Sequence, residues 1–201
     1  NAGSSLKNTA TLSTATTADV TVTIGTAGTA TEGTDYTDGS GNLNDITISA
    51  GSTTGTVSFT PSDDSGDPVY EENETAIISI DGVSGGSASE SGSQSVTITI
   101  TENESAPTVT LTRSAASIAE NSGSTVTLTA TLSIKVDEAV TVALSTSSAA
   151  TEGTDYGTIS DITISAGSTT GTATFDPTDD SVYEDDEAAV IAIDSVSGGG
   201  A

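Results

Sequence analysis

Two acidic stretches of similar layout are the residues of this chain best suited to chemistry. DDSVYEDDE, residues 179–187, places six carboxylates within nine residues around one tyrosine. DDSGDPVYEENE, residues 63–74, has the same order of groups, with three extra residues before its tyrosine. A hard cation such as Ca²⁺ takes six to eight oxygen ligands at about 2.3–2.6 Å. Because two carboxylates about 4 Å apart repel each other by roughly 1 kcal/mol in water, each stretch predicts a bound cation or a highly solvated loop.

The solvated loop is the ordinary interpretation of a single acidic run. Here the same spaced pattern, an acidic pair, a tyrosine, an adjacent glutamate and a glutamate three residues further on, occurs twice. Solubility alone does not require this repetition, which favours cation binding.

The charge balance of the whole chain points the same way. Among 201 residues, 29 are acidic and three are basic, for a net charge of -26. Nucleic acids and anionic membrane surfaces need a basic footprint, which this chain lacks. Cations are therefore the expected partners.

The absent residue types exclude several chemistries. The chain has no Cys, His, Met or Trp, so His-activated nucleophiles and the usual zinc and copper ligand sets are excluded. Hydrolysis by a carboxylate pair remains chemically possible, but four Tyr and two Phe leave little for a sugar-stacking cleft. We therefore expect that the chain is not an enzyme.

The sequence shows no membrane-spanning or signal segment. No apolar run approaches the length of a membrane span, and the N-terminus NAGSSLKNTA lacks a signal-peptide layout. Either a signal was removed or the chain is an excerpt.

Alternation of apolar residues with Thr or Ser predicts half-buried strands between turns rich in Gly, Asn, Asp and Ser. No segment has a helical apolar stripe, and the spacing favours an all-β sandwich. The predicted strands are residues 9–13, 18–24, 46–49, 55–59, 76–80 and 95–100, and then 108–112, 124–133, 138–144, 161–165, 171–175 and 188–193.

The two series of strands form an internal repeat. TEGTDY occurs at 31–36 and at 151–156, an offset of 120 residues, and ITISAGSTTGT occurs at 46–56 and at 162–172, an offset of 116. We expect two domains, residues 1–106 lacking an opening strand and residues 107–201 lacking a closing strand. Two accounts remain open: an excerpt from a longer array of such domains, or a homopolymer in which a neighbouring subunit completes the open sheet edges by strand complementation.

The combined motif resembles the Calx-beta domain. It consists of TEGTDY, a strand ending in Phe, DDxxYExxE in the second copy, and a strand followed by the triplet ENE and a Pro in the first. This family occurs in sodium/calcium exchangers and in tandem within large bacterial surface proteins. The resemblance implies an all-β fold of two tandem immunoglobulin-like (Calx-beta-type) β-sandwiches, each binding Ca²⁺ at one end.

The resemblance also implies the calcium ligands. In the first copy they are Asp35, Asp63, Asp64, Glu71, Glu74, Glu102, Asn103 and Glu104; in the second they are Glu120, Asp155, Asp179, Asp180, Glu184 and Glu187. The first copy lacks the opening-strand Glu and the second lacks the closing acidic triplet, so weaker binding or fewer ions per site is expected. Tyr70 and Tyr183 are expected to pack and anchor their loops, Asp67, Asp185 and Asp186 to be exposed, and residues 38–45 to form an ordinary hairpin loop.

The function that these features predict is a calcium-binding extracellular structural repeat, an adhesin stalk or filament segment at a microbial cell surface. Ca²⁺ would stiffen the end of the first sandwich and its junction with the second, and the partners would be calcium ions and neighbouring domains of the array. The alternative is a regulatory Ca²⁺ sensor, as in the sodium/calcium exchangers. A carbohydrate-binding accessory module would need a row of surface aromatics, which the sequence does not show.

Overall fold

The chain forms two compact units. The computed structural model describes residues 4–62, 69–183 and 185–201. One unit is drawn from residues 1–66 and 73–103, and the other from residues 67–72 and 104–201. Each is described here by itself.

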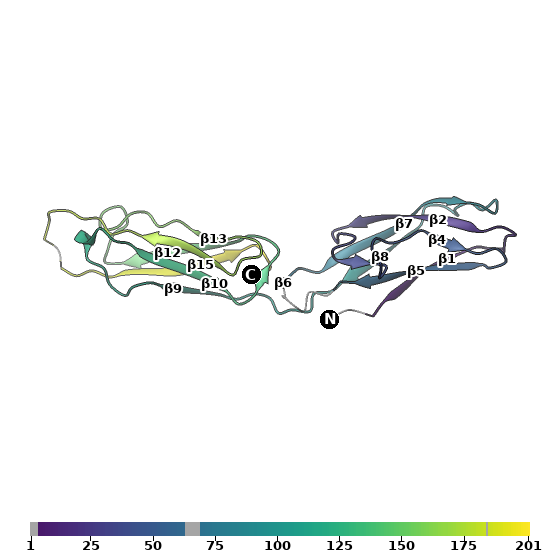
Figure 1. The fold of residues 1–201 in the computed structure, drawn as a ribbon. Helices are drawn as coiled ribbons and strands as arrows, with labels where there is room; N and C mark the ends of the chain where they lie inside the picture. Colours follow the sequence, from purple (N-terminus) through teal and green to yellow (C-terminus); the bar gives the residue numbers. More distant parts are fainter. Residues whose placement is uncertain (1–3, 63–68, 184) are drawn as a thin grey trace. The chain divides into compact units, whose positions relative to one another are not determined.

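The first unit is a sandwich of two antiparallel sheets (Figure 1). One sheet has the order β1-β5-β3, and the other has the order β4-β2-β7-β8. The strands are β1 (Leu6–Thr11), β2 (Val20–Gly28), β3 (Tyr36–Thr37), β4 (Ile46–Ile48), β5 (Thr54–Pro61), β7 (Glu74–Ser84) and β8 (Ser95–Ile100).

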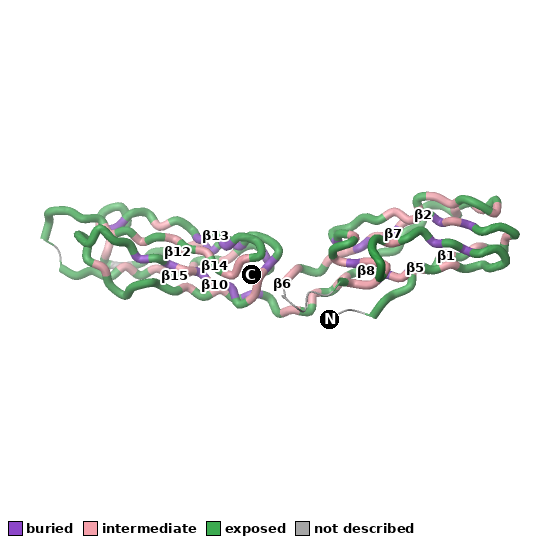
Figure 2. The backbone as a smooth tube through the Cα atoms, viewed as in Figure 1, coloured by how far each residue is buried: buried purple, intermediate pink, exposed green. Residues whose placement is uncertain are grey.

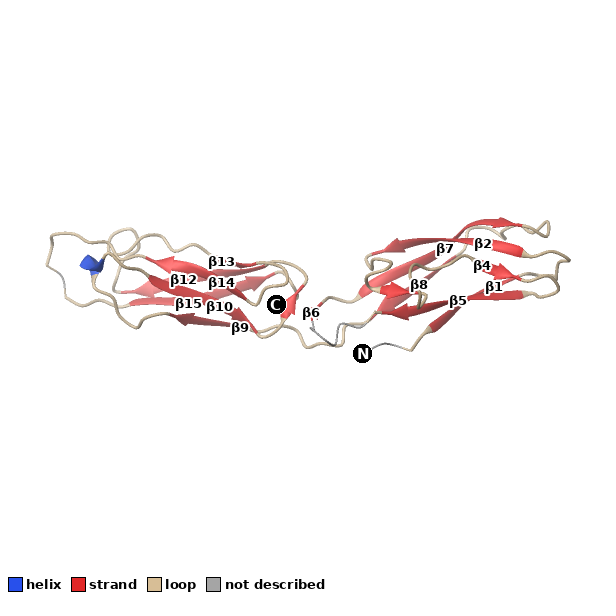
Figure 3. Ribbon diagram, in the orientation of Figure 1, coloured by secondary structure: helices blue, strands red, loops and turns tan. Residues whose placement is uncertain are grey.

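The second unit repeats this arrangement with sheets ordered β14-β10-β9 and β13-β12-β15. Its strands are β9 (Val109–Arg113), β10 (Val126–Leu132), β12 (Val140–Ser148), β13 (Ile162–Ile164), β14 (Thr170–Phe175) and β15 (Ala189–Ser197). A short parallel pair, β6 (Val69–Tyr70) with β11 (Lys135–Val136), also belongs to this unit. In the described part of the chain the one helical element is the 3-10 turn η1 (Glu120–Ser122), drawn in blue in Figure 3.

The core follows from the alternation read in the sequence. β4 and β13 both have the burial order buried, exposed, buried, and Figure 2 shows buried positions along the strands and exposed loops at their ends. Val, Ile and Leu fill most of the core. An aromatic pair adds to it in each unit: Tyr36 stacks on Phe59 at 4.6 Å between ring centroids, and Tyr156 on Phe175 at 4.9 Å.

The all-β prediction is confirmed, and each predicted strand corresponds to an observed one. The elements that the sequence did not predict are the short ones, β3, β6, β11 and η1. A strand of two residues has no room for a period-two pattern, so the alternation gives no signal there.

The two units differ in which sheet edges are covered. Among the described strands β10 pairs with both β14 and β9, whereas its counterpart β1 pairs only with β5. In the other sheet β7 pairs with both β2 and β8, whereas its counterpart β15 pairs only with β12. Among the described strands, each unit therefore contains one strand pairing whose counterpart the other does not contain.

Some carboxylates have a structural role that the sequence analysis missed. A β-bulge interrupts the β2–β7 register between Thr23 and Ile24, and the Asp45 Oδ1 atom accepts a hydrogen bond from the Ile24 N–H at 3.1 Å. The second unit repeats this at its own bulge, where the Asp161 Oδ1 atom accepts from the Leu144 N–H at 3.1 Å. Because a bulge leaves backbone groups without ladder partners, these two carboxylates satisfy backbone N–H groups at the bulges.

Candidate metal centre

Asp35 is held by the turn that TEGTDY forms. Its Oδ2 atom accepts a hydrogen bond from the Thr31 N–H at 2.6 Å, and its own N–H donates to the Thr31 carbonyl at 2.9 Å. The next residue, Tyr36, is 1% exposed and stacks on Phe59. Burial raises the pKa of the Tyr36 hydroxyl, so this residue stays neutral. The turn and the buried ring together fix the half-buried Asp35 carboxylate at the end of the sandwich.

Glu74 and Glu71 complete a cluster with Asp35. Glu74 begins β7 and pairs with Ile100, the last residue of β8, while Glu71 lies three residues before it in the chain. Carboxylate oxygens of Asp35, Glu71 and Glu74 all lie within 4.8 Å of one another. Of the fourteen ligands that the resemblance implies, these are the three that the structure brings together in this way among the described residues.

The geometry of this cluster fits a calcium ion. Two oxygens separated by 4.8 Å can each lie at about 2.4 Å from an ion between them, which is within the range of calcium–oxygen bonds. All three donors are carboxylates, the hard oxygen ligands that Ca²⁺ prefers over softer metals. Without a cation the three charges repel one another. The cluster can therefore supply three of the six to eight oxygens that such an ion needs.

The segment after β8 is anchored beside the start of β7. The Glu102 N–H donates to the Asn73 Oδ1 atom at 2.8 Å, and the Asn103 N–H donates to the Glu102 Oε1 atom at 2.6 Å. Asn73 immediately precedes Glu74, so its side chain holds the backbone of the predicted ligand Glu102 at this end of the sheet. The anchoring role of Asn73 was missed because an exposed Asn in an acidic run has no distinct sequence signal. The remaining predicted ligands of this copy, Asp63 and Asp64, lie outside the described residues, as does Asp67.

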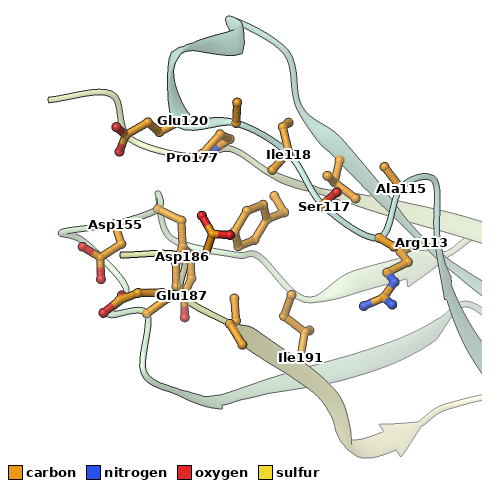
Figure 4. A pocket seen from close by; sticks show the side chains of 18 of the residues that line it. Arg113, Ala115, Ser117, Ile118, Glu120, Asp155, Pro177, Asp186, Glu187 and Ile191 are labelled. Atoms are coloured by element: carbon orange, nitrogen blue, oxygen red, sulfur yellow. The ribbon is translucent and has the colours of Figure 1, made fainter. Parts of the chain in front are cut away.

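The second unit repeats the turn. The Asp155 Oδ2 atom accepts from the Thr151 N–H at 2.5 Å, and the Asp155 carbonyl accepts from the Thr178 N–H at 2.9 Å. Glu120 lies on η1, and Glu187 lies two residues before β15. Asp155, Glu120 and Glu187 all line one pocket of about 610 Å³. Figure 4 shows them toward one end of it, with Arg113 and Ile191 toward the other. Among the described residues of this unit no three carboxylates approach as closely as those of the first cluster.

The acidic loop of the second unit is largely solvated. Asp179 and Asp180 are exposed, and the Asp180 Oδ1 atom accepts a hydrogen bond from the Val182 N–H at 2.6 Å. Asp185 and Asp186 are exposed, as expected, and they also line the pocket. Glu184 lies outside the described residues.

The packing prediction for the two loop tyrosines is confirmed for one and wrong for the other. Tyr70 is half-buried in β6 and packs against the core of the second unit. Tyr183 is 91% exposed, beside Val182 at 60%. The reason is that Tyr70 lies in a paired strand, whereas Tyr183 lies in a loop that no described strand covers.

The loop of residues 38–45 is held by its own hydrogen bonds. The Asp38 carboxylate accepts from the hydroxyl and N–H of Ser40, both at 2.7 Å, from the Gly41 N–H at 3.1 Å, and from the Asn44 side-chain amide. These bonds, the Ser40 hydroxyl first, lower the pKa of Asp38. Glu32, which the sequence analysis did not single out, accepts from the Leu43 N–H at 2.5 Å. Both carboxylates thus serve the loop.

Among the residues that the structure describes, no helix is long and apolar enough to cross a membrane.

Comparison with known proteins divides the chain into two halves. Residues 9–104 match the family model of the Calx-beta domain, and residues 105–201 match that of the LapA domain. The resemblance to Calx-beta domains is thus confirmed for the first half, and the second half, although it repeats the first, is matched to the LapA domain. No curated protein matches the chain.

The solved structures that are similar to the chain include the following two. One is CBD12 from CALX1.2, which is 21% identical, with 86% of this chain and 68% of that chain covered and a TM-score of 0.40. The other is the calcium binding domain CBD12 of CALX1.1, which is 20% identical, with 94% and 73% covered and a TM-score of 0.40.

Proposed function

We propose that the chain, whose residues 9–104 match the Calx-beta domain model and whose residues 105–201 match the LapA domain model, is a calcium-binding structural repeat of an extracellular adhesin. Both are non-catalytic domains with binding or structural roles. Calx-beta domains typically bind Ca²⁺, and the two domain types are typical of secreted surface adhesins. The observation that carries the calcium assignment is the group formed by Asp35, Glu71 and Glu74.

In this proposal the ion acts on the end of the first sandwich. Asp35 lies on a turn between β2 and β3, and Glu74 lies at the start of β7. Binding both to one ion replaces the repulsion of the carboxylates by attraction and fixes the turn against the sheet. Glu102, Asn103 and Glu104 supply further oxygens from the segment that Asn73 anchors, and Asp63 and Asp64 complete the set.

A second, weaker site uses the equivalent turn of the second unit. Its ligands are Glu120, Asp155 and Glu187, together with Asp179, Asp180 and Glu184. The support is that the first three line one pocket and that Asp155 is held by the same hydrogen bond as Asp35.

The mechanical consequence concerns the short junction after β8. Only six residues separate Ile100 from Pro107, which is buried, and the boundary of the proposed domains falls between Ala106 and Pro107. An ion held by Glu102 and Glu104 restrains this segment, so Ca²⁺ stiffens the stalk. The LapA match favours an adhesin stalk or filament segment over a regulatory calcium sensor, because it associates the chain with adhesins and not with transporters.

The experiment is to measure ¹⁵N relaxation of the full chain in Ca²⁺ and in chelator. We expect a common rotational correlation time for the two units and slow local motion of residues 101–106 with Ca²⁺. In chelator we expect faster local motion in this segment and separate correlation times, because the carboxylates repel one another. Mg²⁺, which is smaller and dehydrates reluctantly, serves as the control. Equal relaxation in Ca²⁺ and chelator would refute the stiffening role.

A further inference from the structure

The turn formed by TEGTDY carries Asp35 and lies against the loop of residues 38–45. Gly33 of this turn has a φ of +85°, and a Cβ atom at this position would lie 3.1 Å from the Asn42 Oδ1 atom. The Asn42 side chain therefore reaches over the turn. The loop that brings it there is held by the hydrogen bonds that its own Asp38 carboxylate accepts.

Glu32 joins the turn to this loop and to strand β2. Its Oε1 atom accepts a hydrogen bond from the Leu43 N–H at 2.5 Å, and its Oε2 atom accepts one from the Thr26 hydroxyl at 3.1 Å. Thr26 lies in β2, and Leu43 packs against the apolar cluster that contains Tyr36. Both oxygens of the half-buried Glu32 carboxylate therefore fix the turn to its surroundings.

Glu32 is close to Asp35 in space as well as in sequence. Burial first, and then the charges of Glu32 and Asp35, raise the pKa of the Tyr36 hydroxyl, so both carboxylates lie near this hydroxyl. Thr31, which immediately precedes Glu32, donates its N–H to the Asp35 Oδ2 atom at 2.6 Å. A displacement of Glu32 would thus move Thr31 and weaken the bond that orients the Asp35 carboxylate.

The second unit repeats the turn without these contacts. The offset between the copies falls from 120 to 116 residues across the loop, so the first unit has four extra residues there. Glu152, the counterpart of Glu32, is exposed. A Cβ atom on Gly153, the counterpart of Gly33, would meet nothing within 4 Å. The longer loop and the compact group of carboxylates thus occur together in the described part of the chain.

We propose that Glu32 is a positioning residue of the calcium site, held in place by the loop of residues 38–45, and that it acts by fixing the Asp35 carboxylate. Glu32 lies outside the group of carboxylates whose oxygens approach within 4.8 Å, and its own oxygens accept hydrogen bonds from the protein. Partners that orient a ligand without touching the ion typically change metal affinity by about 10–100-fold. This inference rests on the proposed function and gives a reason why the first site is the more compact.

Calcium calorimetry on the full chain tests this role with two variants of one residue. Glu32→Gln removes the charge but keeps an oxygen for the Leu43 N–H and an amide group for the Thr26 hydroxyl. Its affinity should stay within about threefold of that of the unchanged chain, because one charge contributes little through water. Glu32→Ala removes both bonds, and its affinity should fall by about tenfold. Equal affinities in the two variants would overturn the proposal.

A loop replacement tests whether the loop acts through Glu32. Replacing residues 37–45 by GTISD, the shorter segment of residues 157–161, should weaken calcium binding about as much as Glu32→Ala does. Combining both changes should weaken it no further, since the two remove the same contact. Additive losses would overturn the proposal. Thermal melts set the temperature of the comparison, at which the first unit of every variant is folded.

A measurement in chelator keeps the positioning role separate from the calcium assignment. Hydrogen exchange of the Thr31 amide, followed by NMR, reports directly on its bond to Asp35. Glu32→Ala should speed this exchange by about tenfold, since a hydrogen bond to a charged group is weakened, and Glu32→Gln should leave it nearly unchanged. If the unchanged chain binds no calcium, the proposed function fails and the exchange still tests the positioning. Unchanged Thr31 exchange in Glu32→Ala would overturn the positioning role.

Discussion

A calcium concentration a hundredfold above the dissociation constant is expected to raise the melting temperature of the first unit by roughly 10–20 °C relative to chelator. An ion that binds only the folded state contributes about 2.7 kcal/mol at this excess, and about 1 kcal/mol shifts the melting temperature of a domain of this size by roughly 4–8 °C. Differential scanning calorimetry of the full chain measures the shift. Since Asp35 and Glu74 of the cluster lie in the first unit, the transition of this unit should move more than that of the second unit.

The control for this prediction is a salt of matched ionic strength. Screening by monovalent ions weakens repulsion between exposed carboxylates, so potassium chloride alone should raise both transitions slightly and to a similar extent. If potassium chloride reproduces the whole calcium shift, the acidic stretches are solvated loops without a bound ion.

The second large effect is expected from the paired phenylalanines. Phe59 is 0% exposed in a closed cluster, so Phe59→Ala should cost about 3–5 kcal/mol of unfolding free energy. Phe175→Ala should cost clearly less, because Phe175 borders an open pocket and is only partly buried. Urea unfolding, monitored separately for each unit by NMR, measures the two losses.

The matched control for this pair is Val57→Ala, a smaller buried residue of the same strand as Phe59. Its cost should lie below that of Phe59→Ala, since less buried apolar surface is removed. Equal losses for Phe59→Ala and Phe175→Ala would contradict the account in which Phe59 is fully buried and Phe175 is only partly buried.

The sequence was most informative where the structure is regular. Alternation in SVTITI and in VTLTATL predicted strands that the structure contains as β8 and β10, because half-buried strands require that pattern. The sequence was uninformative for β6 and β11, since pairing between Val69–Tyr70 and Lys135–Val136 depends on tertiary contacts and not on local composition.

The candidate site was predictable only in part, because tertiary contacts also decide which acidic residues come together. The resemblance singled out Asp35, Glu71 and Glu74, which the structure brings together, but spacing alone could not distinguish them from Asp179 and Asp180, which are exposed. Asp45 and Asp161 were not singled out from the sequence, although each carboxylate accepts a hydrogen bond from a backbone N–H group at a β-bulge. The sequence does not reveal where these bulges lie. Tyr183 was wrongly expected to pack because its loop shares the motif of Tyr70 but not its strand pairing.

The most direct test of the central claim is calcium calorimetry on the full chain and on two variants with equal charge removal. The first variant combines Asp35→Asn, Glu71→Gln and Glu74→Gln, and the second combines the exposed changes Asp137→Asn, Glu138→Gln and Asp194→Asn. The account predicts calcium binding to the unchanged chain, a loss of at least tenfold in affinity at the first site in the first variant, and no such loss in the second. Equal weakening in both variants, or no binding to the unchanged chain at millimolar Ca²⁺, would contradict it.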